Sequence, residues 1–170
     1  MTEPASSQLD TRFSDPSAQA TGWDTTLEVL ERAELFWVTT VRADGRPHTT
    51  PLVAVWSDGA MWFSTGLGEQ KEINLRANRH VILMTGRNDW DQGLDIVVEG
   101  EAERVEDRGR LERAAHAWTK KWDGRWTYDV TDTGFEHAGD GHHQVLVFAV
   151  RPERVLAFGK GDFSHTSHRF

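Results

Sequence analysis

The stretch "WFSTGLGEQKEINL", residues 62–75, is where the chain passes from a strand to a helix. Trp62 to Thr65 are aromatic or hydroxyl-bearing residues typical of a strand end. Gly66 and Gly68 then allow the backbone to turn sharply and to approach a ligand closely. Residues 69–78 predict a short helix with Ile73 and Ala77 on one face.

Two interpretations of this junction remain open at this point. The amides at a helix N-terminus are unpaired donors, and Ser64, Thr65, Gln70 and Lys71 add hydroxyl, amide and ammonium donors beside them. These groups together suit a phosphate. The other interpretation is an ordinary strand–helix connection with a solvated lysine, because glycine and lysine at a helix start form a weak motif.

The residues before this junction predict a helix followed by three antiparallel strands. Thr25 and Glu28 have the spacing of a capping box, which predicts a helix that starts there and ends near Glu34. Turn signals at Asp44-Gly45 and at 57–59 separate the three strands. The predicted strands span residues 35–41, 48–56 and 60–65. Pro51 lies inside the second strand and indicates an edge, a bulge or a break that faces a ligand.

The residues after the junction predict more strands and one long helix. The helix spans 106–122, with Leu111, Ala114, Ala115 and Trp118 on its inner side. The strands are 80–85, 94–105 with a bend at Gly100, 144–151, and 153–159 beyond Pro152. Residues 123–143 are predicted to be a long loop. The total is about seven strands and three helices, mainly antiparallel, and closure into a small barrel would remove the sheet edges.

Composition sets the class of protein. Residues 1–20 are polar and predict a disordered tail, and residues 21–170 predict a single domain. The net charge of −8 argues against nucleic acid as a partner, and the chain has no apolar run long enough for a membrane span. The absence of cysteine favours a cytoplasmic protein without disulfides.

Histidines are common metal ligands, and three of them lie close together in the last third of the chain. His137, His142 and His143 lie near two carboxylates, but they lack the spacing of a helical metal motif, so no metal site is predicted there. His165 and His168 near the C-terminus are better candidates for contact with a ligand. The segment "WTKKWDGRW", residues 118–126, predicts a cap over a ligand or lysine stems that cover tryptophan faces.

Four segments in this order resemble the pyridoxamine 5′-phosphate oxidase-like family of flavin- or deazaflavin-dependent split-barrel oxidoreductases. They are "VTTVRADGRPHTTPLVAVW", "DGAMWFSTGLGEQKEINLRANRHVIL", "VVEGEAERV" and "RPERVLAFGKGDFSHTSHRF". The resemblance covers roughly residues 27–170. It implies a mainly β (α+β) fold, a six- or seven-stranded antiparallel split β-barrel that binds FMN, with peripheral helices.

The resemblance also implies a cofactor site. The strand along the ring would be Thr50, Pro51, Leu52, Val53, Ala54 and Val55. Ser64 and Thr65 would contact ring and phosphate, and Gln70 and Lys71 would hold the phosphate. Asp95 matches a position on the ring, where the family commonly has glutamine. The family builds its site at a homodimer interface, so Trp90 and residues 164–170 would come from the partner chain.

The cofactor implied by the resemblance is FMN or the deazaflavin coenzyme F-420. Gln70 stands where flavin-binding members typically carry arginine, which leaves one phosphate charge unmatched. Cations for the F-420 tail would be Arg76, Arg79, Lys120, Lys121 and Arg125. The expected function is hydride transfer between the ring and a small organic substrate. A non-catalytic protein that binds flavin or haem, and a cofactor-free interaction protein, are the alternatives.

Overall fold

The computed structural model describes residues 3–137 and 144–170 of the chain. Its three helices are α1 (Trp23–Arg32), α2 (Gln70–Ala77) and α3 (Arg108–Lys121). Its strands are β1 (Ser6–Leu9), β2 (Leu35–Val41), β3 (Pro47–Ser57), β4 (Ala60–Gly66), β5 (His80–Thr85), β6 (Leu94–Val105), β7 (Tyr128–Val130), β8 (Phe135–His137), β9 (Gln144–Gly159) and β10 (Ser164–Arg169).

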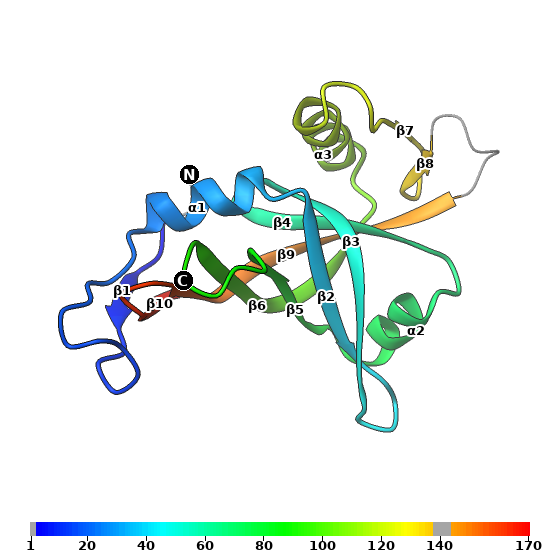
Figure 1. Cartoon of the computed structure of the whole chain (residues 1–170). Helices are drawn as coiled ribbons and strands as arrows, with labels where there is room; N and C mark the ends of the chain where they lie inside the picture. The colour runs from blue at the N-terminus through cyan, green and yellow to red at the C-terminus, as the bar shows by residue number, and fades with distance from the viewer. Residues whose placement is uncertain (1–2, 138–143) are drawn as a thin grey trace.

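Six of these strands form a closed antiparallel barrel. The order is β9-β4-β3-β2-β5-β6, and β6 pairs again with β9 to close the ring. Figure 1 shows β9 and β6 running through the middle of the molecule, with β1 and β10 at one end and α3, β7 and β8 at the other. The predicted split-barrel fold is confirmed, with six strands in the barrel.

The barrel is split between β3 and β4. These strands pair only from Ala54 opposite Phe63 to Ser57 opposite Ala60. Beyond that point β4 pairs on its other side with β9, as far as Gly66, while β3 continues along β2. The stretch of β3 that contains Pro51 therefore has a single neighbour, which agrees with an edge position for a residue that lacks an N–H.

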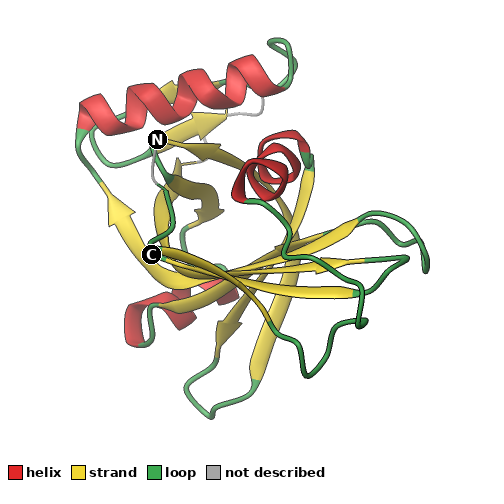
Figure 2. Cartoon of the chain, turned by 90° about the vertical axis from the view of Figure 1, so that its left-hand side faces the viewer, coloured by secondary structure: helices red, strands yellow, loops and turns green. Residues whose placement is uncertain are grey.

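Two apolar clusters hold the fold together. The first fills the barrel and includes Phe36, Phe63 and Leu83, all fully buried. The second lies between the barrel wall and α3 and is centred on Trp118 and Phe135. Figure 2 shows the helices lying outside the strands. The buried side of α3 is the predicted one, since Leu111, Ala114, Ala115 and Trp118 are all buried.

Two predictions in the second half of the chain are wrong. Residues 123–143 are not one loop, because β7 and β8 form a short hairpin that extends the sheet from β9. The strands predicted on either side of Pro152 are one continuous strand, β9. A register shift at Gly100 leaves Glu153 as an extra residue between the partners of Glu99 and Gly100, and such a bulge accommodates a proline.

Two predictions in the first half also change. The segment predicted as a disordered tail contains β1, which pairs with β10. Helix α1 starts at Trp23 after Gly22 and has no side-chain cap, so the capping box predicted at Thr25 is wrong. In α2 the side chains of Ile73 and Ala77, predicted to share a face, are both exposed, and Leu75 is the buried apolar residue. Over the described residues, no helix is long and apolar enough to cross a membrane.

Candidate functional site

The residues predicted to contact the cofactor lie on both sides of the split between β3 and β4. Thr50 to Val53 belong to the part of β3 that has left β4, and Ser64 and Thr65 to the part of β4 that has left β3. Gln70 and Lys71 open α2 directly after β4. Ala54 and Val55 lie where the two strands still pair, and both are buried. The fold thus gathers these residues around one opening of the barrel wall.

Two side chains on β3 have buried polar atoms without partners at this opening. Thr50 Oγ1 and His48 Nδ1 are both out of solvent, and neither has a hydrogen-bond partner among the described residues. Burial lowers the pKa of His48, and the nearby charges of Arg42 and Lys71 lower it further. A buried polar group without a partner costs free energy, so these two atoms point to a ligand that supplies the missing bonds.

The predicted phosphate site already holds an anion from the chain itself. Thr65 Oγ1 donates a hydrogen bond of 3.1 Å to Glu69 Oε2, and Lys71 Nζ bonds the same oxygen. Burial raises the pKa of Glu69, but the bond and charge of Lys71 more than offset it and leave that pKa below its ordinary value. The carboxylate of Glu69, at the N-cap of α2, therefore takes the hydroxyl and the ammonium that were expected to hold a phosphate.

The other donors near this helix start are also engaged. Gln70 Nε2 donates to Asn74 Oδ1 at 2.8 Å, and Asn74 Nδ2 donates to Thr40 Oγ1 at 2.8 Å. Arg76 bonds the buried carboxylate of Glu72, at 2.6 Å and 2.9 Å. The set formed by Lys71 and Glu69 carries no net charge, and a dianionic phosphate would gain little from it unless Glu69 moved away.

Ser64 makes a contact that the sequence did not predict. Its Oγ lies 2.9 Å from the hydroxyl of Tyr128 on β7, and burial raises the pKa of that tyrosine. The hairpin that carries Tyr128 was predicted to be part of a loop. The missed signal was the alternation around Tyr128 and Val130, which is too short to predict a strand with certainty.

Trp90 and Asp95 lie apart from the split. The indole of Trp90 is 95% exposed on the loop before β6. Asp95 pairs with Lys160 at 2.9 Å, and both line a cavity of about 380 Å³ with Trp90 and Phe158. No residue of the β3, β4 or α2 group lines that cavity. Within one chain, the residues predicted to bind the cofactor therefore lie in two separate places.

The C-terminal histidines have structural contacts. His168 is fully buried, with Nδ1 at 2.7 Å from Ser7 Oγ and Nε2 at 3.0 Å from Thr26 Oγ1. Both ring nitrogens are thus bonded, and burial lowers the pKa of this histidine. His165 stacks on Phe158 with ring centroids 4.6 Å apart. The bonded ring of His168 does not favour an axial ligand to haem, whereas Nε2 of His165 is buried and has no hydrogen-bond partner among the described residues.

The structure tests the possibility of a metal site only for the residues that it describes. Among residues 3–137 and 144–170, no group of three or more histidine, aspartate or glutamate side chains could hold a metal ion. His142 and His143 lie outside the described residues. The prediction for that segment therefore stays a prediction.

Comparison with known proteins defines the class. A model of the pyridoxamine 5′-phosphate oxidase family matches residues 23–158, so the chain belongs to that family. A search of curated proteins found no match.

Solved structures share the fold at low sequence identity. A conserved hypothetical protein from Mycobacterium tuberculosis has a TM-score of 0.67 at 19% identity, over 85% of this chain and 89% of that one. A protein described as an F420 reductase has a TM-score of 0.55 at 24% identity, over 75% and 93%. A FAD-binding protein from Mycobacterium smegmatis has a TM-score of 0.58 at 19% identity, over 88% and 98%.

Proposed function

We propose that this protein is a flavin- or deazaflavin-dependent oxidoreductase that transfers hydride between a bound ring and a small organic substrate. The observation that carries the proposal is the opening between β3 and β4, where Thr50 Oγ1 and His48 Nδ1 are buried without partners. The family supports it, as do structural neighbours named F420 reductase and FAD-binding protein. The cofactor supplies the hydride chemistry when it is bound.

The residues of β3 would hold the ring. Thr50 to Val53 form a strand edge with one neighbour, so their backbone groups on the other side are available to a planar ligand. Pro51 is exposed and presents no N–H, which gives a flat apolar surface in the middle of that edge. Thr50 and His48 would bond polar atoms of the ligand and fix its orientation.

The charges near α2 favour some cofactors over others. Lys71 is the cation expected to hold the phosphate, and it is paired with Glu69. A phosphodiester carries one negative charge and fits this neutral pair better than the dianionic phosphate of FMN. Arg76 and Arg79, expected to bind the tail of F-420, are paired with Glu72 and Glu101. We therefore propose that the site binds F-420 more tightly than FMN. This preference rests on the charge of the phosphate group alone, because the two arginines are already paired.

We propose a homodimer in which the partner supplies Trp90 and the C-terminal residues to the site. Leu35 and Trp37 on β2 and Met84 on β5 are exposed large apolar side chains, and Trp37 and Met84 are opposite each other in the ladder. Such a patch on the barrel wall is typical of a protein interface. Light scattering at micromolar concentration should give twice the mass of 19.3 kDa, and a monomer with an occupied site would contradict the proposal.

The experiment that tests the function begins with the purified protein. Its absorption spectrum and mass spectrometry of the released ligand identify a bound ring, and titrations with FMN, FAD and F-420 rank the cofactors. A chromophore that bleaches with a reductant and recovers with a candidate substrate supports the enzyme. A chromophore that binds but never turns over supports the non-catalytic alternative.

The lack of cysteine leads us to propose that the protein is cytoplasmic.

A further inference from the structure

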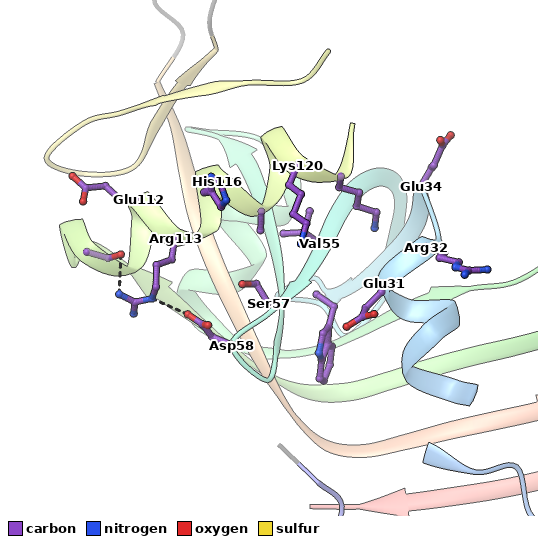
Figure 3. Close-up of a pocket in the computed structure, with 14 residues that line it drawn as sticks. Glu31, Arg32, Glu34, Val55, Ser57, Asp58, Glu112, Arg113, His116 and Lys120 are labelled. Carbon is purple, nitrogen blue, oxygen red and sulfur yellow. Dashed lines mark hydrogen bonds and ion pairs between the residues drawn. The ribbon is translucent and has the colours of Figure 1, made fainter. Parts of the chain in front are cut away.

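A second cavity lies outside the proposed cofactor site. It has a volume of about 980 Å³ and is lined by the end of α1, the turn between β3 and β4, and one side of α3. Figure 3 shows the side chains of these three elements that surround it. We call this the α1–α3 cavity. Of the residues predicted to hold the ring and phosphate of the cofactor, only Val55 lines it, and Lys120 and Lys121, expected to bind the tail of F-420, line it as well.

Lys121, the last residue of α3, lies half-buried in the α1–α3 cavity. Its Nζ donates a hydrogen bond of 2.9 Å to the carbonyl oxygen of Ala54. The same nitrogen lies 5.4 Å from the ring centroid of Phe36 and 5.1 Å from that of Trp122. No carboxylate of the described residues lies within ion-pair distance of it. The amine therefore has aromatic and backbone neighbours in place of a counter-ion.

Burial shifts the protonation equilibrium of Lys121 towards the neutral amine. Burial lowers its pKa to about 8, although the carboxylates of Glu31 and Glu34 act in the opposite direction. An amine with a pKa of about 8 is a few hundred times more often neutral near pH 7 than an ordinary lysine with a pKa of about 10.4. Only the neutral amine is a nucleophile, as in lysines that react with carbonyl groups.

The other three lysines of the chain do not combine burial in a cavity with the lack of a carboxylate partner. Lys71 bonds the carboxylate of Glu69. Lys160 pairs with Asp95 at 2.9 Å and also donates to backbone carbonyls. Lys120 is exposed on the rim of the same cavity, next to Lys121 in sequence. The chain thus contains its own matched control.

The cavity around Lys121 has charged groups of both signs. From α1 come Glu31, Arg32 and Glu34, and from the turn comes Asp58. From α3 come Glu112, Arg113, His116 and Lys120. Arg113 is paired with Asp58 at 2.8 Å. With Lys121, the cavity has four carboxylates, four side chains of arginine or lysine and one histidine, so it selects for neither an anion nor a cation.

We propose that Lys121 forms an imine with a small uncharged aldehyde that enters the α1–α3 cavity. The amine nitrogen attacks the carbonyl carbon and gives a carbinolamine, which then loses water to leave a C=N bond. The carbonyl oxygen leaves in that water with the two protons of the amine. His116 and Glu31 line the cavity and can exchange these protons. Phe36 and Trp122 would stabilise the protonated imine through their ring faces.

The experiment is reductive trapping with butyraldehyde and cyanoborohydride on the full chain. At about pH 7.5, where an ordinary lysine is almost fully protonated, peptide mapping should find Lys121 alkylated at least about tenfold faster than Lys120. The rate at Lys121 should rise with pH and level off above about pH 8, whereas the rate at Lys120 should keep rising through pH 10.

Two variants separate the site from its neighbours. Lys121→Arg keeps a cation and should abolish the fast alkylation, and Lys120→Arg should leave it unchanged. Equal rates at Lys120 and Lys121 in the folded wild-type protein would overturn the proposal. So would a Lys121 rate that keeps rising through pH 10. These results do not depend on which cofactor binds between β3 and β4.

Discussion

Lys71 and Lys121 stand at opposite ends of helices and differ in what surrounds the amine. Lys71, in the first turn of α2, bonds the carboxylate of Glu69. Lys121, at the end of α3, bonds a backbone carbonyl and faces two aromatic rings. A carboxylate partner stabilises the ammonium, whereas a carbonyl replaces only part of its lost hydration. The ammonium of Lys71, which the sequence predicts as an anion ligand, is thus paired with the carboxylate of Glu69. Lys121 has a lowered pKa in place of such a partner, which raises the share of neutral amine.

The largest expected effect concerns the packing that holds Lys121 in place. Trp118 lies one turn before Lys121, is fully buried, and contacts Tyr128 and Phe135 edge to face at 5.6 Å and 5.8 Å. Trp118→Ala removes the centre of the second cluster and should cost about 3–5 kcal/mol of unfolding free energy. Urea denaturation followed by circular dichroism measures it.

The matched control for that substitution lies on the helix of Lys71. Ile73 on α2 is 48% exposed, so Ile73→Ala should change the unfolding free energy by less than about 0.5 kcal/mol. A loss below about 1 kcal/mol for Trp118→Ala would mean that α3 is not held by its tryptophan. In that case it would be wrong to contrast α3, held by apolar packing, with the start of α2, held by an ion pair.

The second prediction tests Lys71 as a cofactor ligand. Lys71→Ala removes the only ion-pair partner that the described residues give Glu69 and leaves that carboxylate to repel a phosphate, so the substitution should weaken cofactor binding by about tenfold to a hundredfold. Folding should change little, because a lysine at a helix start opposes the helix dipole. Titration calorimetry with FMN and F-420 measures both affinities, and Lys120→Ala is the control for FMN, which has no anionic tail. Unchanged affinities in a folded Lys71→Ala protein would place the anion site elsewhere.

The third prediction tests Glu69 as the internal competitor of the phosphate. Glu69→Gln removes the negative charge and frees Lys71 and the hydroxyl of Thr65. Binding of FMN should strengthen by about tenfold, or about 1.4 kcal/mol, and that of F-420 by less, because a dianion gains more from an unpaired cation. The same calorimetry measures the change. An equal or weaker affinity for FMN in Glu69→Gln would show that the carboxylate does not compete with the ligand.

The fold could be predicted from the sequence where its signals are local. The turns at Asp44-Gly45 and at 57–59 set the three-strand meander, and the spacing of Leu111, Ala114 and Trp118 set the buried side of α3. The strands β1, β7, β8 and β10 were not predicted. The first three have three or four residues each, and β10 has the polar sequence SHTSHR, which lacks an apolar alternation. Short strands of this kind carry almost no pattern of their own.

The residues that the fold brings together at the split could be predicted in part from the sequence, but the interactions among them could not. The position of Pro51 indicated an edge strand, which the pairing of β3 confirms. The role of Glu69 could have been suspected, because a carboxylate at a helix start lies where the dipole favours an anion. The environment of Lys121 could not, since Ala54 and Phe36 are more than sixty residues away along the chain and only the fold brings them together.

The smallest expected effect concerns the pH dependence of stability at Lys121. Its pKa is about 8 in the folded chain and has an ordinary value of 10.5, so the unfolded state holds more protons between these two pH values. Stability from this group therefore rises with pH across that window, and below pH 8 the folded chain bears the full cost of a desolvated ammonium. Lys121→Met removes that cost.

We expect Lys121→Met to be more stable than the wild type at pH 7, by on the order of 1 kcal/mol, because an unpaired buried charge is replaced by an apolar side chain of similar length. The advantage should shrink as the pH rises from 8 towards 10.5 and the wild-type amine loses its proton in both states. Urea denaturation at several pH values in this window measures the difference, and Lys120→Met, on the exposed rim, should show neither the gain nor the trend. A Lys121→Met protein less stable than the wild type at pH 7, or a difference that stays constant across the window, would mean that Lys121 is folded as an ordinary ammonium. In that case the environments of Lys71 and Lys121 would differ in geometry but not in protonation.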